Sequence, residues 1–186
     1  MPQPTLLMLC GSLRRASINR KLMRAAGALF PGEVIEGDLR LPLYDGDLEE
    51  TGLPEAVVRL AGQIRAADAL LIACPEYNKA PPGVLKNALD WVSRVKGFPL
   101  DGKPVAIVSA ASGRSGGERA QSLLRWMLHP LRARVLTHPE VLVAGGAAAF
   151  DAAGGLADER AQQLLQTLVS ALAAEAAQTA ARRSAA

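Results

Sequence analysis

The sequence contains few aromatic residues, little cysteine and no long apolar run. Only seven of its 186 residues are aromatic, whereas 34 of them, about 18%, are alanine. A folded core must therefore be built from Leu, Val and Ile, with Ala filling the close contacts between them. Charged residues make up 21% of the chain, near the average of globular proteins, which excludes disorder along the whole chain. The length predicts a single domain.

The chain also lacks the residue clusters that hold disulfides and metals. Its two cysteines, Cys10 and Cys74, are too few for a disulfide framework, and no Cys-x-x-Cys pair indicates zinc. His129 and His138 are isolated from other metal-binding residues, so we predict no metal site. We expect both cysteines to be buried, inert thiols rather than redox-active ones.

No segment indicates export, membrane insertion or nucleic-acid binding. No stretch reaches the ~18 uninterrupted apolar residues of a membrane helix, and the N-terminal residues lack the features of a signal peptide. The formal net charge is only +3, and Arg182 and Arg183 near the C-terminus supply two of those units. We therefore expect a cytoplasmic protein with neither a membrane nor a nucleic-acid partner.

Short apolar runs alternate with helical patterns along the chain. The first, third and fourth runs are almost purely aliphatic, which is typical of strands that are buried on both faces. The predicted strands are 5–10, 33–37, 69–73, 104–109 and 135–143. The predicted helices are 19–30, 54–67, a segment from about 82, a segment after 117, and 156–181. Residues 38–52 are polar and are predicted to form a loop.

This alternation predicts an α/β fold, with a doubly wound, five-stranded parallel sheet covered by helices on both faces. The domain is expected to span residues 1–173. Beyond it the sequence is Ala-rich and without pattern, so 174–186 are expected to form a frayed tail. In such folds ligands bind outside the carboxyl ends of the strands, where the strand order reverses. The loops after the first, third and fourth strands are therefore the candidates for a site.

The loop at 11–19 runs from a strand into a helix and is rich in hydrogen-bonding groups. Ser12 and Ser17 supply hydroxyls, Asn19 an amide, and Arg14 or Arg15 a positive charge. With the free N–H groups of a helix start, these residues suit a phosphate monoester. In the alternative interpretation, Ser17 or Asn19 only caps the helix and the arginines are solvated. Neither a Walker loop nor a GxGxxG motif occurs, which argues against an ATPase and against tightly held NAD.

The other two loops differ in character. Residues 75–83 contain three prolines that stiffen the loop, and Tyr77 and Asn78 beside them suit contact with a flat heteroaromatic ring. The alternative is a prolyl turn with an exposed tyrosine. Residues 109–117 are glycine-rich, which lets the backbone approach a ligand closely, although a flexible connection would have the same composition.

Three segments together resemble the NAD(P)H-dependent FMN reductase family: GSLRRASIN, PEYNKAPPGVLKNALDWVSR and SGRSGGERAQSLLRWML. The resemblance covers about residues 5–143. It implies a flavodoxin-like fold with strand order 2-1-3-4-5, FMN as cofactor and NADPH or NADH as electron donor. The implied acceptor is a small molecule: a quinone, a free flavin, an azo compound or a metal oxyanion. It also implies a homodimer or homotetramer.

The same resemblance places the FMN phosphate in the first loop and the isoalloxazine between the other two. The implied cofactor-binding residues are Ser12, Arg14, Ser17, Ile18, Asn19, Pro75, Glu76, Tyr77, Asn78, Ser112, Gly113 and Arg114. Arg114 stands where the family usually has a small residue, so Arg114 and Tyr77 are expected to shape the acceptor site. No side chain is expected to act as a catalytic acid or base, because the flavin carries the chemistry.

We therefore predict an enzyme that passes a hydride from NAD(P)H to FMN and then to an acceptor in a ping-pong cycle. The alternatives are a flavodoxin-type electron carrier and an FMN-binding redox sensor, neither of which has a substrate of its own. Carriers of this fold tend to be acidic and to use a Thr/Ser-rich phosphate loop, whereas this chain is basic and offers Arg and Asn there. Rapid oxidation of NADPH by catalytic amounts of protein would distinguish the reductase from both.

Overall fold

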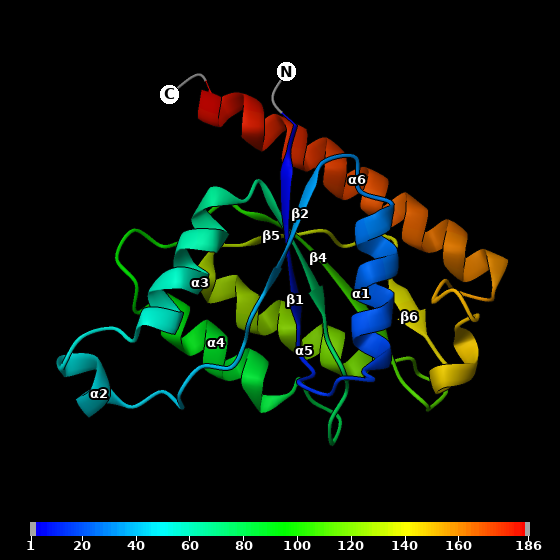
Figure 1. The fold of residues 1–186 in the computed structure, drawn as a ribbon, viewed down its shortest axis with the longest axis horizontal. Coiled ribbons are helices and arrows are strands. Elements are labelled where there is room, and N and C mark those ends of the chain that lie inside the picture. The colour runs from blue at the N-terminus through cyan, green and yellow to red at the C-terminus, as the bar shows by residue number, and fades with distance from the viewer. Residues whose placement is uncertain (1–2, 185–186) are drawn as a thin grey trace.

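The aliphatic runs form the central strands of one parallel sheet. The computed structural model describes residues 3–184 (Figure 1). Its strands are β1 Thr5–Cys10, β2 Glu33–Gly37, β3 Ala69–Ala73, β4 Pro104–Ala110, β5 Arg134–Val135 and β6 Val141–Val143. The sheet order is β2-β1-β3-β4-β5, β6 also pairs with β4, and every pairing is parallel. The predicted doubly wound sheet and its strand order are confirmed.

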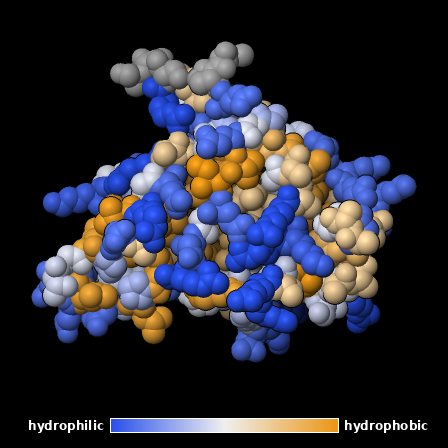
Figure 2. Space-filling view, in the orientation of Figure 1, coloured by the Kyte–Doolittle hydropathy of each residue, from blue (hydrophilic) through white to orange (hydrophobic). Residues whose placement is uncertain are grey.

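Helices cover both faces of this sheet. They are α1 Ile18–Ala28, α2 Gly46–Glu50, α3 Glu55–Ala66, α4 Gly83–Ser93, α5 Glu118–Leu128 and α6 Glu159–Ser184, with short 3-10 turns at His129–Leu131 and Gly146–Ala149. Figure 1 shows α1 and α6 on one face and α3, α4 and α5 on the other. Figure 2 shows that the lower edge of the molecule in this view, where the strands end, is mainly hydrophilic.

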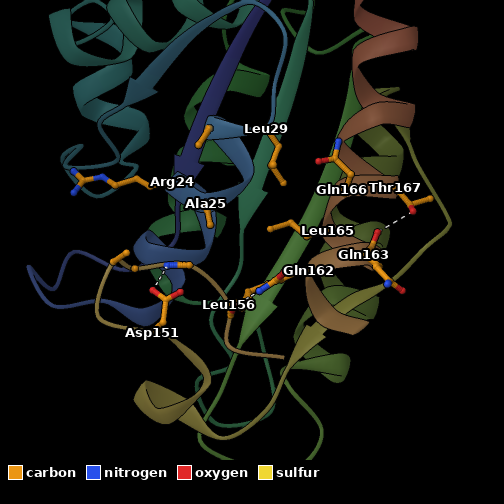
Figure 3. A pocket seen from close by; sticks show the side chains of 14 residues that line it. Arg24, Ala25, Leu29, Asp151, Leu156, Gln162, Gln163, Leu165, Gln166 and Thr167 are labelled. Carbon is orange, nitrogen blue, oxygen red and sulfur yellow. Dashed lines mark hydrogen bonds between the residues drawn. The ribbon is translucent and has the colours of Figure 1, made fainter. Parts of the chain in front are cut away.

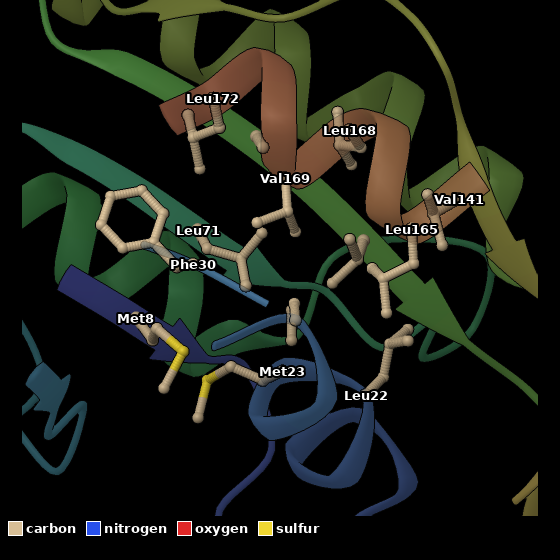
Figure 4. Packing of buried hydrophobic residues seen from close by; sticks show 14 of the residues in the cluster. Met8, Leu22, Met23, Phe30, Leu71, Val141, Leu165, Leu168, Val169 and Leu172 are labelled. Carbon is tan, nitrogen blue, oxygen red and sulfur yellow. The ribbon is translucent and has the colours of Figure 1, made fainter. Parts of the chain in front are cut away.

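Successive residues of β1 supply two separate cores, because side chains alternate between the faces of a strand. Leu6 and Met8 pack toward α1 and α6, whereas Leu7 and Leu9 pack toward α3 and α4. Figure 4 shows the first of these cores, in which Met8 and Met23 lie below the Leu and Val side chains of α6. With so few aromatic residues, these layers are aliphatic, as the composition predicted.

The last predicted strand, 135–143, is interrupted in the structure. β5 pairs with the start of β4 and β6 pairs with its end, while the residues between them leave the sheet. Pro139 lies in that interruption, and it has no backbone N–H to donate to a neighbouring strand. The single strand was therefore wrong, although both of its ends pair where expected.

The predicted loop at 38–52 also contains a helix that the sequence analysis missed. The side chain of Asp45 accepts a hydrogen bond from the N–H of Asp47 and so begins α2, which extends only to Glu50. None of its residues is buried, so the apolar pattern that marks the other helices is absent here.

The expected frayed tail at 174–186 is part of α6, which continues to Ser184. Ala176 and Ala180 are buried and continue the buried stripe of Leu165, Leu168 and Leu172 at helical spacing. Alanine gives a weak hydrophobic signal, yet its small side chain lets the helix lie close to the sheet. Residues 185 and 186, also assigned to that tail, lie outside the described residues. Among residues 3–184, no helix is long and apolar enough to cross a membrane.

Candidate functional site

The loops that follow β1, β3 and β4 meet around one pocket of about 580 Å³, which is a usual size for a small-molecule site. These three loops lie at the lower edge of the sheet in Figure 1, where the order of the strands reverses. Ten of the twelve implied site residues line it: Ser12, Arg14, Ser17, Ile18, Asn19, Pro75, Glu76, Tyr77, Ser112 and Gly113. The other lining residues are Ala16, Ala110, Ala111, Ser115 and Ala147.

Asn78 and Arg114 do not line the pocket, and both are exposed. Asn78 and Lys79 have positive φ values of 51° and 66° and form the tip of a tight hairpin. The hairpin is closed by the N–H of Tyr77, which donates to the carbonyl of Ala80 at 2.9 Å, and by the reverse bond at 3.1 Å. An asparagine suits position 78 because asparagine tolerates the left-handed conformation that such a turn requires.

The first loop presents hydroxyl groups next to the start of α1. The Oγ of Ser17 accepts a hydrogen bond from the N–H of Arg20 at 3.3 Å and so caps the helix, while its own proton is left to donate. Ser12 is buried, and its Oγ lies 3.4 Å from the hydroxyl of Tyr77, which connects the first loop to the second. The first N–H groups of α1 have no partner within the helix and favour an anion.

Asn19, which the motif resemblance assigns to the phosphate site, also connects two of the loops. Its Nδ2 donates to the carbonyl of Ala110 at 2.7 Å, and its Oδ1 accepts from the N–H of Ala110 at 2.9 Å. The buried amide therefore ties the start of α1 to the end of β4. Asn19 thus positions the first loop against the third, and the second N–H of its Nδ2 stays free to donate toward the pocket that it lines.

Glu76 connects the second loop to α5. This helix begins at a glycine, Gly117, which offers no side-chain cap. The Oε2 of Glu76 accepts from the N–H of Ala120 at 3.3 Å, and its Oε1 lies 3.7 Å from Arg119. A carboxylate is stabilised at a helix N-terminus, so Glu76 supplies the cap from outside the helix and fixes the second loop relative to the third.

The third loop is anchored by two buried polar residues that the sequence analysis missed. The Oγ of Ser109 donates to the carbonyl of Gly116 at 2.6 Å. The Nε2 of Gln121 donates to the Oγ of Ser109 at 2.8 Å and to the carbonyl of Val141 at 2.9 Å. Gly116 has a φ of 59°, and a Cβ there would lie 2.6 Å from the backbone of Leu142. The sequence signal for this anchor was Gln121, a polar residue among the apolar positions of α5.

The two cysteines, Cys10 at the end of β1 and Cys74 directly after β3, are free, buried thiols. Burial raises the pKa of Cys74 to about 12, and the nearby Glu76 and Cys10 add to the shift. A thiol with that pKa is protonated at neutral pH and is a poor nucleophile. Among the described residues, no group of three or more His, Cys, Asp or Glu side chains is arranged to hold a metal ion.

A larger cavity of about 810 Å³ lies between α1 and α6, bordered by residues 151–156 (Figure 3). Leu29 and Leu165 point into it. Two of its polar side chains bond to neighbouring backbone: Asp151 accepts from the N–H of Gly155 at 2.9 Å, and Gln162 donates to the carbonyl of Leu156 at 2.5 Å. None of the three loops lines this cavity, so volume alone does not locate the site.

The fold and the smaller pocket define a flavodoxin-like protein with a small-molecule site built by three loops. The family model of NADPH-dependent FMN reductases matches residues 4–148 of the chain. The chain belongs to this family, and the family predicted from its motifs is confirmed. It is accordingly an NAD(P)H-dependent FMN reductase by class, with FMN as its cofactor.

Individual relatives agree with this assignment. An NAD(P)H-dependent FMN reductase of Pseudomonas aeruginosa is 48% identical over 169 residues, which cover 89% of this chain and 91% of the relative. A quinone reductase of Escherichia coli is 45% identical over 139 residues, which cover 72% and 74% of the two chains. The solved structure of a flavoenzyme, an NAD(P)H:acceptor oxidoreductase from Paracoccus denitrificans, superposes with a TM-score of 0.86 at 34% identity, covering 95% of this chain and 98% of that one.

Proposed function

We propose that the protein reduces quinones with electrons from NAD(P)H, using FMN held in the three-loop pocket. The observation that carries this proposal is the convergence of ten motif residues, from loops far apart in the sequence, on one pocket of about 580 Å³. The quinone reductase from Escherichia coli supports the choice of acceptor. Bound FMN would supply the chemistry, because it accepts a hydride from the nicotinamide and passes two electrons to the acceptor.

The first loop fits the phosphate end of FMN. Arg14 lines the pocket and can pair with a phosphate, and Ser12 and Ser17 contribute hydroxyls beside the N-terminus of α1. Asn19 keeps this group in register by its two hydrogen bonds to Ala110. A phosphate in the first loop would thus be bound by a segment that is tied to the end of β4.

The second and third loops fit a flat ring. Pro75 stiffens one side, and Ala110, Ala111 and Ala147 give the pocket a wall of small side chains. A Cβ on Gly113 would meet nothing within 4 Å, so the backbone there borders open space. Tyr77 is 48% exposed and stands at the mouth, where it would contact the donor and the acceptor in turn.

This arrangement favours a ping-pong cycle. The pocket is walled by three loops, so a nicotinamide and a quinone would use the same open side of the ring. The oxidised donor then leaves before the quinone binds, and the quinone takes up two electrons and two protons to become a hydroquinone. The chain's own groups bind, orient and stabilise charge, and no side chain is required to remove a proton.

We also propose that copies of the chain associate. The exposed face of α5 carries Leu123 and Trp126, three residues apart, and Trp126 is 77% exposed. A second copy is the occupant that the motif resemblance implies. Analytical ultracentrifugation would show a dimer or a tetramer that Trp126→Glu shifts toward the monomer, and a monomer at all concentrations would contradict the proposal.

The test of function is an absorption spectrum of FMN-supplemented, desalted protein, before and after NADPH is added without oxygen. Retained flavin that bleaches rapidly, and recovers its colour when 1,4-naphthoquinone is added, supports a quinone reductase. Flavin that is retained but not bleached by NADPH or NADH would indicate the carrier or sensor instead. Initial rates should give parallel double-reciprocal lines, and intersecting lines would contradict the ping-pong cycle.

A further inference from the structure

One arginine of α1 holds the first loop from outside the pocket. The N–H of Arg20 donates to the Oγ of Ser17 at 3.3 Å, in the cap that begins the helix. The guanidinium of Arg20 reaches back along the chain, and its Nη2 donates to the carbonyl of Ser12 at 3.2 Å. Ser12 lines the pocket of about 580 Å³, whereas Arg20 and Leu13 line a separate cavity of about 260 Å³. Arg20 therefore contacts the loop without lining the site.

An acidic residue of β2 fixes the position of this guanidinium. The Nη1 of Arg20 forms an ion pair with the Oε1 of Glu36, and β2 is hydrogen-bonded to β1 in the sheet. The side chain of Arg20 is 19% exposed, which makes it the least exposed of the ion-paired arginines in the described chain. A guanidinium that bonds to a carboxylate and a carbonyl together has a defined orientation, because its donors form a rigid fork. The sheet thus holds Arg20, and Arg20 holds the loop.

The hydrogen bond to Ser12 sets the orientation of the peptide between Ser12 and Leu13. This peptide is trans, so the N–H of Leu13 points away from the carbonyl of Ser12. Within residues 3–184 that N–H donates to no protein group, so it is free to donate to a ligand. Free backbone N–H groups beside a helix N-terminus bind phosphate. Without Arg20 the peptide could rotate, and its carbonyl would then replace the N–H as the group presented to the anion.

We propose that Arg20 is a positioning residue for the FMN phosphate and that Glu36 holds Arg20 in place. The inference rests on the placement of the phosphate in the first loop under the proposed function. Arg20 acts through the peptide that follows Ser12, because its own side chain does not line the pocket. Its charge is compensated by Glu36, so it orients donors rather than attracting the anion itself. The pair should therefore affect binding of the phosphate and not binding of the flavin ring.

Riboflavin is the probe that separates these two parts of the cofactor, because it has the ring system of FMN and lacks the phosphate. Fluorescence titration of the apoprotein would give the Kd for each ligand. The ratio of the riboflavin Kd to the FMN Kd then measures what the phosphate contributes. A substitution that only loosens the fold weakens both ligands and leaves this ratio unchanged, whereas one that misplaces the phosphate loop lowers it.

Arg20→Met keeps most of the apolar stem of the side chain and removes its donors. It should raise the Kd for FMN about 3- to 10-fold and that for riboflavin by less than about 2-fold, since a charge-assisted hydrogen bond to the loop is lost. Arg24→Met is the matched control. Arg24 lies 3.3 Å from the same Glu36, but it is 65% exposed and donates to no carbonyl of the first loop. Its substitution should change the ratio by less than about 2-fold.

Glu36→Ala tests how Arg20 acts, because the two possible modes predict changes of opposite sign. If Arg20 positions the loop, loss of the carboxylate that holds it should lower the ratio about 2- to 5-fold. If Arg20 instead attracted the phosphate by its charge, loss of the compensating carboxylate would raise the ratio. Glu36→Ala also decides the question alone if Arg20→Met does not fold.

An unchanged ratio in Arg20→Met, or an unchanged or raised ratio in Glu36→Ala, would overturn the inference and leave the reductase function standing. Equal losses in Arg20→Met and Arg24→Met would also overturn it, since only Arg20 of these two arginines reaches the loop. If the unsubstituted protein bound riboflavin as tightly as FMN, the proposed phosphate site in the first loop would be wrong, and this inference would be removed with it.

Discussion

Charged groups at the two edges of the sheet differ in how deeply they are buried. At the amino edge Asp68 is fully buried, accepts from the N–H of Thr5 at 2.9 Å, and pairs with Arg183 of α6 at 3.0 Å. Lys103 is buried beside it and donates to the carbonyl of Ala67, and burial lowers its pKa. At the carboxyl edge Lys79 and Arg114 are exposed without acidic partners in the described chain.

This difference in burial distinguishes charged residues that stabilise the fold from charged residues that are free to bind a ligand. A buried carboxylate that accepts hydrogen bonds is costly to remove, because its donors are left unsatisfied. Exposed, unpaired cations contribute little to folding and are free to meet an anion. Substitutions at the amino edge should therefore change the free energy of unfolding, and substitutions at the carboxyl edge should change ligand affinity.

The largest expected effect is on FMN affinity at the carboxyl edge. Arg14→Ala should raise the Kd for FMN about 10- to 100-fold, because a charge-assisted hydrogen bond contributes about 1.5–3 kcal/mol. Fluorescence titration of the apoprotein with FMN measures this. Arg15→Ala is the control, since Arg15 does not line the pocket, and its effect should stay below about 3-fold. Equal losses for the two variants would remove the phosphate assignment of Arg14.

The amino edge should show the reverse pattern. Asp68→Ala should lower the free energy of unfolding by about 1–3 kcal/mol, because the N–H of Thr5 loses its acceptor inside the protein. Arg183→Ala should cost about 1 kcal/mol or less, since Arg183 is half-exposed. Urea denaturation of the apoprotein measures both, and the Kd for FMN should stay unchanged. A weaker Kd in Asp68→Ala would show that the two edges are coupled.

The buried thiol of Cys74 is predicted to be chemically inert, unlike the exposed side chains of the three loops. Cys74 has a pKa raised to about 12 in the folded protein, against about 9 in the unfolded chain. Between these values the unfolded chain loses a proton that the folded protein retains, so stability is full below about pH 9 and falls as the pH rises. The expected slope is about 1.4 kcal/mol per pH unit.

Cys74→Ala should remove this slope between about pH 9 and 11. Urea denaturation of the two proteins at several pH values measures the difference. Turnover of 1,4-naphthoquinone at neutral pH should be the same in both proteins, because the thiol has no chemical role. Parallel stability curves for the two proteins would contradict the raised pKa.

Local patterns predicted the strands and loops because their signals lie in adjacent residues. The aliphatic runs of β1, β3 and β4 are buried wherever they are placed in a parallel sheet, and the motif loops necessarily follow them. The partners of polar side chains were not predictable in this way. Asn19 binds Ala110, which is 91 residues away, and Arg183 reaches Asp68 across 115 residues.

The same limit explains the errors at the ends of elements. Ala176 and Ala180 give no periodic signal that distinguishes them from solvent-exposed alanines, and only the sheet beneath α6 decides that they are buried. The short acidic helix α2 is set by one capping aspartate, Asp45, and not by an apolar face. Features that depend on packing or on one cap are therefore the ones that the sequence pattern did not reveal.

The smallest predicted effect tests whether Glu76 contributes both to folding stability and to FMN binding. It caps α5, which contributes to folding, and it adjoins Tyr77 in the pocket. Glu76→Ala should lower the free energy of unfolding by about 1 kcal/mol and weaken FMN binding about 2- to 4-fold, because the second loop is no longer held to α5. Glu76→Gln keeps an oxygen that accepts from the N–H of Ala120 and should recover most of both losses.

Arg119→Ala is the control for the ion pair. Because Arg119 is well exposed and lies 3.7 Å from Glu76, its loss should change either free energy by less than about 0.5 kcal/mol. If Glu76→Ala lowered stability but left the Kd for FMN unchanged, the second loop would hold its position without this contact, and Glu76 would be a helix cap alone.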